Sequence, residues 1–461
     1  MKHNSIPKKN RIQRIPPTLR RLIVANSIKV TCALNLPILT TFFVGLGCTA
    51  VADFKGKSGP KLWMLGKDGL NEDLLVSLNE DKWAIPINMY RGLPKIIAKK
   101  YLPTEVDDNS YDAFGDLYLK EKNDYMETWR TIFRYLPDSK RPAAITTGNF
   151  GYYAERELAS AASKESIPFI AMHKECLKSD GRLAFFKEIY ERRGQFTGSK
   201  ILVYNERERK LQIDSKVATE GQVIVCGMPR LDRLHKWRIN EGRRVNDSIT
   251  LLAMGFTEKT GLPRVPRKGD KGGQARFEYL EPEHEHMGWH KYFYKYHETL
   301  IKIARDDPSI IVKLKLKSRY RDAEPSIKLV KKLNAPDNFK IVVGGDPFEL
   351  IINSNVVCGF NTTAILEGLA AGLPVVTPEF DEVIDSKMRD FAPSFGEATY
   401  RPNDQESMYN VIVGLLKSKT QPVKELTNDV KDALDIWVGN SDGNAGNRVR
   451  QVFEKEMKIR Q

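Results

Sequence analysis

The chain has 461 residues, and its 73 Lys and Arg outnumber its 59 Asp and Glu, which gives a formal net charge of +14. This length predicts two or three domains, and a content of 41% hydrophobic residues excludes a wholly disordered chain. Five cysteines without paired C-x-x-C spacing exclude a disulfide scaffold and a cysteine-based metal or redox site. The charge favours an anionic partner, which composition leaves open among nucleic acid, a phospholipid surface and a phosphorylated substrate.

The N-terminal region combines a basic segment with an apolar one. Residues 1–29 contain eight Lys and Arg and no acid, and the 23 residues from Val30 to Ala52 carry no charge. A helix of about 20 apolar residues can cross a bilayer, and the basic flank would hold its first end in the cytoplasm. Asn35 and Pro37 interrupt the run, so a helix that turns back at Pro37 and a buried segment remain alternatives. The small residues at Thr49–Ala52 also leave a cleaved signal peptide open. We predict membrane association at the cytoplasmic face, with a single span as one form of it.

The stretch Leu19–Lys29 has apolar side chains at helical spacing beside Arg20 and Arg21. A helix of this kind can lie on an anionic surface. An ordinary solvated helix has the same pattern, so both interpretations stay open.

Between residues 58 and 240, short apolar runs alternate with helical patterns. Such runs are typical of a parallel sheet that helices cover on both faces. We therefore predict a Rossmann-like domain over residues 58–240, on the acceptor side of a cleft. Its predicted strands are Lys61–Leu65, Pro142–Thr146, Ile167–Met172, Lys200–Tyr204 and Gln222–Cys226, and its predicted helices include Asn71–Leu78 and Tyr152–Ser163.

A second series follows over residues 248–440, after a polar join at Leu234–Asp247. Two such series predict an α/β protein with two doubly wound Rossmann-like domains that face a cleft, and residues 1–57 form an N-terminal extension. Ligands bind at the carboxyl ends of the strands in such folds. The predicted strands are Ile249–Met254, Ile310–Leu314, Lys340–Val343, Asn355–Gly359 and Pro374–Thr377, and the predicted helices are Tyr292–Arg305, Ser326–Leu333, Pro347–Ile352 and Thr362–Ala371.

Two features lie outside this alternation. The insertion Thr257–His290 is polar, Gly-rich and charged, and it fits a mobile binding loop or a disordered surface insertion equally well. Further on, Glu406–Leu416 and Val449–Ile459 have amphipathic patterns. Residues 441–461 are predicted to contain a C-terminal helix.

The most informative segment for chemistry is Gly345–Pro378. A predicted strand runs into Asn361, Thr362 and Thr363, which are expected to cap the helix that follows. Free backbone N–H groups and hydroxyls at a helix start suit a phosphate. Glu367 lies one turn beyond Thr363, and its carboxylate can accept two hydrogen bonds from a vicinal diol such as ribose.

The whole segment resembles the nucleotide-binding half of GT-B glycosyltransferases. It also resembles the matching region of UDP-N-acetylglucosamine 2-epimerases and of CDP-glycerol glycerophosphotransferases, which act in surface-polymer synthesis. The resemblance implies that Thr362 and Thr363 contact the diphosphate of a nucleotide-linked donor, and that Glu367 contacts its ribose. It also implies a reaction without a catalytic metal or other cofactor, because helix dipoles and basic residues can stabilise the leaving diphosphate.

A second segment supports the resemblance. Gly227, Pro229, Arg230 and Asp232 match the G-x-P-R-x-D that closes the N-terminal domain of glycerophosphotransferase-like and capsule-synthesis enzymes. The resemblance implies that Gly227 and Pro229 shape a turn at the cleft floor, and that Arg230 and Asp232 orient the two domains. A turn with a salt-bridged surface pair is the alternative.

A basic run follows the strand predicted at Ile310–Leu314. Lys313, Lys315 and Lys317 alternate along the strand, so at least one should reach the cleft, and Arg319 follows them. Related enzymes often carry K-x-H-P here, with the basic group near the donor phosphates, and this chain lacks the His-Pro pair. A solvated basic face is the alternative.

His173 and Glu175 are the candidate catalytic residues. His173 follows a predicted strand at the rim of the cleft, where an imidazole can take a proton from an acceptor hydroxyl and Glu175 can orient it. Gly148 and Asn149 follow a neighbouring strand and would border the acceptor. A structural histidine is the alternative to the catalytic one.

The histidines of the insertion are weak metal candidates. His284, Glu285 and His286, with His290, lie on a charged loop without a supporting cysteine. We predict no metal site.

These features predict a metal-independent enzyme that transfers a sugar or polyol phosphate from a nucleotide-linked donor to a cell-surface glycan or lipid-linked acceptor. A nucleotide-sugar 2-epimerase is the first alternative, although the additional cleft carboxylates and histidines it needs have no assignment in the sequence. A non-enzymatic binder of RNA or anionic lipid is the second, and the chain has no RNA-binding module or aromatic stacking platform. The basic residues are concentrated ahead of the apolar run and at the predicted donor site. This distribution favours a membrane and a phosphorylated donor over nucleic acid as the anionic partner.

Overall fold

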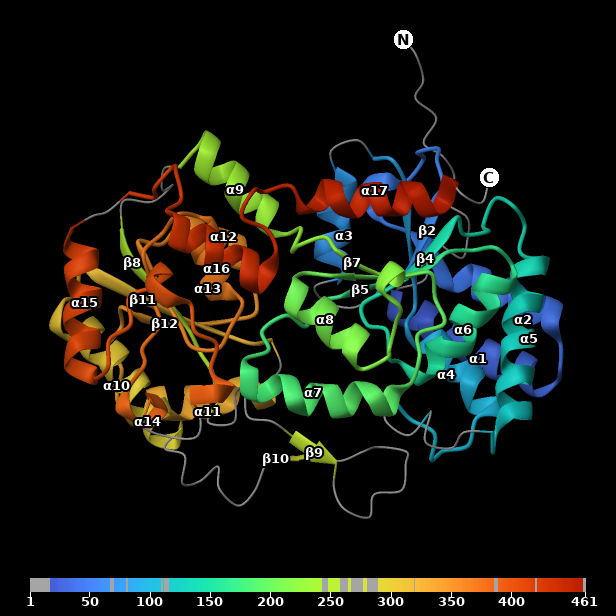
Figure 1. Cartoon of the computed structure of the whole chain (residues 1–461), viewed down its shortest axis with the longest axis horizontal. Helices are drawn as coiled ribbons and strands as arrows, with labels where there is room; N and C mark the ends of the chain where they lie inside the picture. Colours follow the sequence, from blue (N-terminus) through green and yellow to red (C-terminus); the bar gives the residue numbers. More distant parts are fainter. Residues whose placement is uncertain are drawn as a thin grey trace, which may run out of the picture.

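The computed structural model describes residues 17–66, 70–79, 82–108, 111, 116–242, 248–257, 264–266, 277–279, 289–318, 320–384, 389–418 and 421–458. Two α/β domains lie side by side, and each is built on a sheet with helices on both faces (Figure 1). Strands from residues 48–225 form a seven-stranded sheet, and strands from residues 249–376 form a five-stranded one. The predicted α/β class with two Rossmann-like domains is confirmed.

The N-terminal sheet has the strand order β1-β3-β2-β4-β5-β6-β7, and all neighbours are parallel except β1 and β3. Its central strands are buried along nearly their whole length, as continuous apolar runs predict for a sheet covered on both faces. The strands are β1 (Cys48–Ala50), β2 (Lys61–Leu65), β3 (Ile85–Met89), β4 (Ala144–Thr147), β5 (Phe169–His173), β6 (Lys200–Val203) and β7 (Val223–Val225).

Successive side chains of these strands enter two different cores. Leu62 and Met64 of β2 pack in one cluster, whereas Trp63 and Leu65 pack in the other, as the alternation of a strand requires. The first cluster includes side chains of α3 (Leu70–Asn79) and α17 (Ala445–Lys458). The second includes side chains of α4 (Gly92–Tyr101), α5 (Leu119–Tyr135), α6 (Tyr153–Lys164), α7 (Asp180–Arg193) and α8 (Glu206–Asp214).

The C-terminal sheet is entirely parallel, with the order β12-β11-β8-β13-β14. Its strands are β8 (Ile249–Met254), β11 (Ile310–Leu316), β12 (Phe339–Val343), β13 (Val356–Cys358) and β14 (Val375–Val376). Helices α10 (Trp289–Asp306), α11 (Tyr320–Lys332) and α15 (Gln405–Lys417) share one core with it. Helices α9 (Leu231–Asn240), α12 (Pro347–Ile352), α13 (Ala364–Ala370) and α16 (Asn428–Val438) share the other.

Smaller elements complete the described chain. β9 (Arg264–Pro266) and β10 (Phe277–Tyr279) pair antiparallel within the predicted insertion. The predicted mobile loop otherwise falls on residues 258–263, 267–276 and 280–288, which lie outside the described residues. The remaining short helices are α14 (Asp381–Ile384) and the 3-10 turns η2 (Ala52–Phe54), η3 (Glu220–Gln222), η5 (Arg389–Phe391) and η6 (Gly396–Ala398).

The apolar run Val30–Ala52 is not one spanning helix. α1 (Pro17–Ala33) ends before Asn35, which has a left-handed φ of 54°, and α2 (Pro37–Gly47) begins immediately after this turn. Asn tolerates a positive φ, and Pro cannot continue a helix because it lacks an N–H, which explains the break. The rest of the run forms β1 and η2. None of the helices in the described ranges has the length and hydrophobicity that a bilayer crossing requires.

The α1–α2 hairpin belongs to the N-terminal domain. Val24, Ile28, Cys32 and Val44 enter the same core as α4 and α5, and β1 pairs with β3. The hairpin lies at the end of the molecule that is remote from the C-terminal sheet (Figure 1). Residues before the predicted boundary at 58 thus extend the first sheet.

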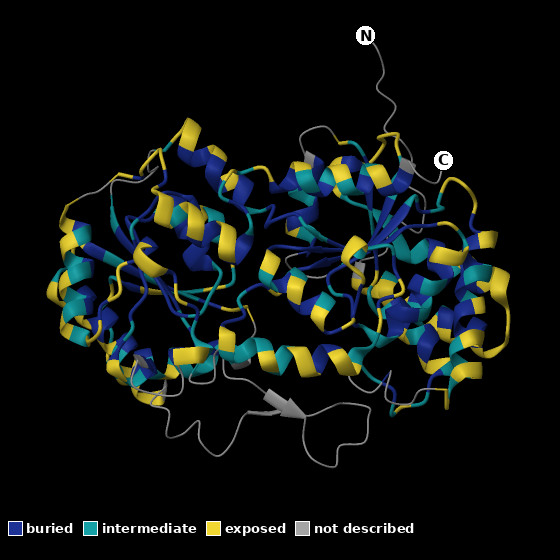
Figure 2. Cartoon of the chain, viewed as in Figure 1, coloured by how far each residue is buried: buried dark blue, intermediate teal, exposed yellow. Residues whose placement is uncertain are grey.

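The chain crosses between the domains twice. α9 leads out of the N-terminal sheet and buries Leu234 and Trp237 in the C-terminal domain, so the first part of the predicted polar join is helical. α17 returns to the N-terminal sheet, where the Phe453 ring lies 5.9 Å from the Trp83 ring. Buried and exposed residues alternate along α17 (Figure 2).

Candidate functional site

Arg230 lies where the two domains meet. It follows β7 at the carboxyl edge of the N-terminal sheet and precedes α9. Its guanidinium lies 3.6 Å from Asp73 Oδ2 on α3 and 3.7 Å from Glu367 Oε1 on α13, so it faces one carboxylate from each domain. Both distances exceed those of a hydrogen bond, and no described residue accepts a hydrogen bond from the guanidinium. The side chain is 19% exposed, so its donors are available to an anion that binds between the domains.

Glu367 and Lys315 lie on the C-terminal side of Arg230. Glu367 is buried on α13, and burial raises its pKa, while Arg230 opposes this shift. Lys315 projects from β11, and burial lowers its pKa, while Glu367, Glu72 and Asp346 oppose the shift. Lys315 forms no ion pair with any residue that the structure describes. We call Asp73, Tyr204, Arg230, Lys315 and Glu367 the interdomain site.

Two members of the interdomain site were not predicted. Asp73 is buried in α3, where it accepts hydrogen bonds from the Tyr204 hydroxyl and, at 3.2 Å, from the backbone N–H of Arg230. Burial is the main reason that the pKa of Tyr204 lies above its ordinary value. Both residues follow strands of the parallel sheet at its carboxyl edge. Asp73 and Tyr204 are 131 positions apart, so no local sequence pattern connects them. Their position after strands at this edge of the sheet was the sequence signal that could have identified them.

Gly227 and Asp232 hold the connection between the domains. Gly227 has a φ of 80°, and a Cβ there would lie 2.3 Å from the carbonyl oxygen of Gly439, so only glycine fits. The Pro229 carbonyl accepts a 2.9 Å hydrogen bond from the Asp232 N–H in the same turn. The buried Asp232 carboxylate accepts hydrogen bonds from Asn440 Nδ2 (2.7 Å), Ala445 N (3.2 Å) and Gly446 N (2.7 Å). It therefore fixes the start of α17, the helix that returns to the N-terminal domain.

The residues before α13 only partly match the expected phosphate site. Thr363 occupies the N-cap but makes no side-chain cap, and Thr362 Oγ1 accepts a long 3.4 Å hydrogen bond from Ala364 N. Asn361 has a φ of 48°, and its buried Nδ2 has no partner among the described residues. It borders a small cavity of about 40 Å³ that is also lined by Phe360, Thr377, Glu379, Arg389 and Phe395.

His173 lies at the end of β5 but is only 1% exposed. Its Nε2 lies 3.0 Å from Glu208 Oε1 and 3.0 Å from the Tyr190 hydroxyl. Burial lowers the pKa of His173, and Glu208 opposes this shift. Although burial disfavours the charge on Glu208, Lys178 and His173 hold its pKa at about 2. His173 forms no hydrogen bond or ion pair with the interdomain site among the described residues, and its catalytic role stays a prediction.

The other predicted residues of the N-terminal domain have local contacts. Glu175 is exposed, and its carbonyl accepts a 2.7 Å hydrogen bond from Lys178 Nζ. Gly148 is buried after β4, and Asn149 Oδ1 accepts a 3.0 Å hydrogen bond from Gly151 N, which closes the turn. At the same edge, burial raises the pKa of Glu155 to about 8, although Thr147 donates a hydrogen bond to its carboxylate. Sequence reasoning had not identified Glu155.

Lys313 and Lys317 form no described ion pair with the interdomain site. Lys313 is half-buried two residues before Lys315, and Lys317 is exposed beyond the end of β11. Arg319 lies outside the described residues, as do His284, Glu285 and His286. In the ranges that the structure covers, no group of three or more His, Cys, Asp and Glu side chains is arranged to hold a metal ion.

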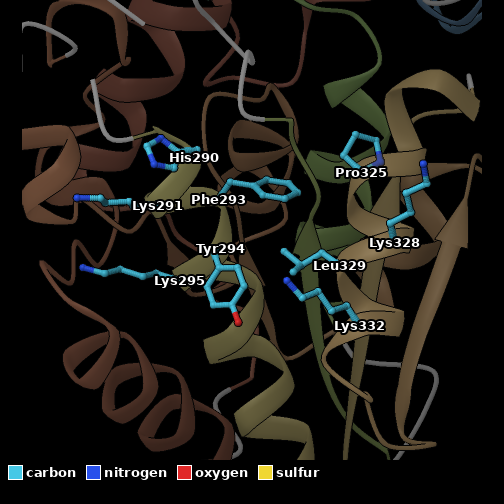
Figure 3. Close-up of a pocket in the computed structure, with 9 residues that line it drawn as sticks. All are labelled: His290, Lys291, Phe293, Tyr294, Lys295, Pro325, Lys328, Leu329 and Lys332. Carbon is cyan, nitrogen blue, oxygen red and sulfur yellow. The ribbon is translucent and has the colours of Figure 1, made fainter. Parts of the chain in front are cut away.

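A groove of about 630 Å³ lies between α10 and α11 (Figure 3). Phe293 and Leu329 give it an apolar floor, and lysines surround it. Two of these lysines are neutralised in ion pairs, Lys295 with Glu382 and Lys328 with Glu324. Because α10 and α11 pack on the face of the sheet opposite to α13, this groove is separate from the interdomain site.

No family model matches the chain, and no curated protein matches it. Solved structures with a similar fold include the UDP-GlcNAc 2-epimerase of Neisseria meningitidis bound to UDP-GlcNAc (11% identity, TM-score 0.45, 86% of this chain and 99% of that chain). Others are S. aureus MnaA with UDP (11%, 0.46, 87% and 98%) and Anabaena HepE with UDP and glucose (13%, 0.43, 86% and 100%). The structures with a similar fold thus include a UDP-GlcNAc 2-epimerase, which belongs to one of the families that Gly345–Pro378 resembles. At these identities and TM-scores this likeness supports no conclusion about substrate or reaction.

Proposed function

We propose that the protein is an enzyme that binds a nucleotide-linked sugar or polyol at the interdomain site and transfers the sugar or polyol phosphate to a glycan or lipid-linked acceptor. The observation that supports this most directly is the state of Arg230. Its guanidinium lies between carboxylates of both domains and donates no hydrogen bond to either of them. A diphosphate between the domains would take up these donors in charge-assisted hydrogen bonds.

The other members of the site suit the rest of a nucleotide donor. Lys315 has no ion-pair partner in the described chain, and it adds a second cation to the interdomain site near Glu367. Glu367 offers carboxylate oxygens to the two hydroxyls of a ribose, which is the role that the resemblance implied. Negative charge develops on the diphosphate as its bond to the sugar breaks, and Arg230 and Lys315 are placed to stabilise that charge.

Transfer also requires a base for the acceptor hydroxyl. The hydroxyl oxygen attacks the anomeric carbon, or the phosphorus of a polyol donor, the bond to the leaving nucleotide breaks, and the hydroxyl proton passes to the base. His173 is the proposed base. Its contacts with Glu208 and Tyr190 bury it in this structure, so this role requires the cluster to open when the acceptor binds.

Epimerisation of a nucleotide sugar is the second candidate, and one observation favours it. Asp73 lies next to Arg230, and the charges of Glu72 and Asp73 both raise the pKa of Glu367. The site therefore contains several carboxylates that the sequence had not assigned. Epimerisation removes a proton from carbon and returns it, and positioned carboxylates are suited to such transfers.

Thermal unfolding with a panel of UDP-, CDP- and GDP-linked sugars and CDP-glycerol tests the proposed site. One donor should raise the melting temperature of the wild-type protein, and Lys315→Ala and Glu367→Gln should reduce that shift. Lys340→Ala is the control, because Lys340 is exposed on the neighbouring strand β12. A panel without any stabilising nucleotide would contradict donor binding.

A product assay separates the two reactions. The stabilising nucleotide sugar is incubated with the enzyme alone and followed by proton NMR. Conversion to a second nucleotide sugar without any acceptor would establish epimerisation. A donor that stays unchanged until a glycan or lipid-linked acceptor is added, and then releases its nucleotide, would establish transfer.

A further inference from the structure

The first part of α2, residues 37–42, exposes apolar side chains and buries polar ones, which is the reverse of a helix on a water-soluble surface. Thr40 and Thr41 are buried at 2% and 3% exposure, whereas Ile38 and Phe42 are 62% and 54% exposed. The threonine hydroxyls are satisfied inside the hairpin: Thr40 donates to Thr31 Oγ1 at 3.0 Å, and Thr41 donates to the Pro37 carbonyl at 2.9 Å. A helix in water normally turns its apolar face inward, so this arrangement indicates an apolar environment outside α2.

The exposed face of α1 continues this apolar surface. Leu22, Ile23 and Val30 are exposed along one side of α1, and Leu34 is exposed just after its end, while Ile28 on the opposite side is fully buried in the core. Single exposed apolar side chains are ordinary. Here, however, residues 19–42 supply nine of the nineteen large hydrophobic side chains that are exposed in the described chain. We call Leu22, Ile23, Val30, Leu34, Ile38 and Phe42 the hairpin patch.

The hairpin and the adjacent helix α4 are basic. α1, α2 and the adjacent α4 contain six basic residues and no acid: Arg20, Arg21, Lys29, Lys95, Lys99 and Lys100. Lys100 donates a hydrogen bond to Asn35 at the turn of the hairpin, which brings a cation to the tip of the patch. α5, which packs against α2 on the other side, contains both acids and bases. An apolar surface beside the basic helices α1 and α4 is complementary to the acyl chains and anionic head groups of a phospholipid layer.

We infer that the α1–α2 hairpin docks the N-terminal domain onto an anionic phospholipid surface, with Ile38, Phe42 and their neighbours inserted at the level of the head groups. The hairpin lies in the interface and does not span the bilayer. A second copy of the chain is a weaker occupant, because a symmetric contact through this face would bring the same basic residues together. The inference is independent of the proposed function, since no member of the hairpin patch belongs to the interdomain site.

Vesicle sedimentation with the full chain tests this inference. Vesicles of phosphatidylcholine alone are compared with vesicles that also contain phosphatidylglycerol, and binding should be stronger to the anionic ones. Ile38→Glu/Phe42→Glu should lower the partition coefficient on anionic vesicles by about tenfold or more, because two apolar side chains no longer enter the layer. Lys29→Glu/Lys99→Glu should lower binding to anionic vesicles and leave the weak binding to neutral vesicles unchanged. Ile436→Glu, at an exposed apolar position of the C-terminal domain, should bind as wild type does.

Far-UV circular dichroism and thermal melting of each variant verify that it is folded. Anionic-vesicle binding that persists in folded Ile38→Glu/Phe42→Glu would overturn the inference, because the basic residues would then suffice. Absence of binding to either vesicle would overturn it as well. Sedimentation velocity without lipid tests whether a second copy of the chain covers the hairpin patch. A wild-type dimer that Ile38→Glu/Phe42→Glu converts to monomer would assign the patch to self-association and overturn the inference.

Discussion

Asp232→Ala should destabilise the protein by removing the anchor of α17. The carboxylate accepts hydrogen bonds from Asn440, Ala445 and Gly446, and all three interactions are buried. Loss of an N-cap acceptor costs about 0.5–2 kcal/mol, and buried donors left without an acceptor cost about 1–3 kcal/mol. Because some donors can rotate or gain water, we expect a net loss of about 2–4 kcal/mol in the free energy of unfolding.

Guanidinium denaturation monitored by tryptophan fluorescence measures this loss. Trp83 packs against Phe453 of α17, so its emission reports the release of this helix. Asp429→Ala is the matched control, because Asp429 is an exposed carboxylate in the first turn of α16, and it should cost less than about 1 kcal/mol. A loss in Asp232→Ala no larger than that of the control would refute the assigned role.

Three further variants test other parts of the structure. Gly227→Ala should cost more than about 2 kcal/mol, because its Cβ would clash with Gly439 O in a left-handed backbone; an unchanged melting temperature would contradict this. Lys178→Met should cost about 3–5 kcal/mol by leaving the buried Glu208 without its main cation, and adding Glu208→Gln should recover part of the loss in denaturant titrations. Burial lowers the pKa of His297 to about 4. Between pH values of about 6.5 and about 4 the unfolded chain therefore binds a proton that the folded chain does not, and the free energy of unfolding should fall as the pH drops through this range. His297→Gln should reduce this slope by up to about 1.4 kcal/mol per pH unit, and identical slopes for both proteins would exclude the effect.

The sheets were predictable because their strands obey a local rule. Buried parallel strands are continuous apolar runs, so KLWML at Lys61–Leu65 and ITLLAM at Ile249–Met254 indicated β2 and β8 with the observed bounds. The helices α5 and α9 were missed because exposed charged residues dominate their sequences. Their apolar residues, such as Trp129 and Trp237, become informative only once their burial is known.

The N-terminal hairpin shows where composition alone gives the wrong structure. An uncharged run predicts a bilayer span, but Asn35 and Pro37 divide it, and buried threonines pair with each other inside the hairpin. The two positions that break the run were visible in the sequence. The side on which each helix packs depends on α4 and α5, which come later in the chain.

The interdomain site was predicted in part. Arg230, Lys315 and Glu367 each follow from a motif or a strand pattern, and the structure brings them together. Asp73 and Tyr204 join them through contacts between distant parts of the sequence, which no local pattern specifies. His173 has the predicted position at a strand end, but Tyr190 of α7 and Glu208 of α8 enclose it, and that burial is likewise a non-local property.

We propose that Arg230 provides its free hydrogen-bond donors to a nucleotide diphosphate between the domains. Isothermal titration calorimetry of wild type and Arg230→Met with the stabilising nucleotide-linked donor tests it most directly, because Met keeps much of the side-chain volume and removes the donors. We expect Arg230→Met, folded by circular dichroism, to bind the donor about tenfold to hundredfold more weakly than wild type. Equal dissociation constants for the two proteins would contradict it.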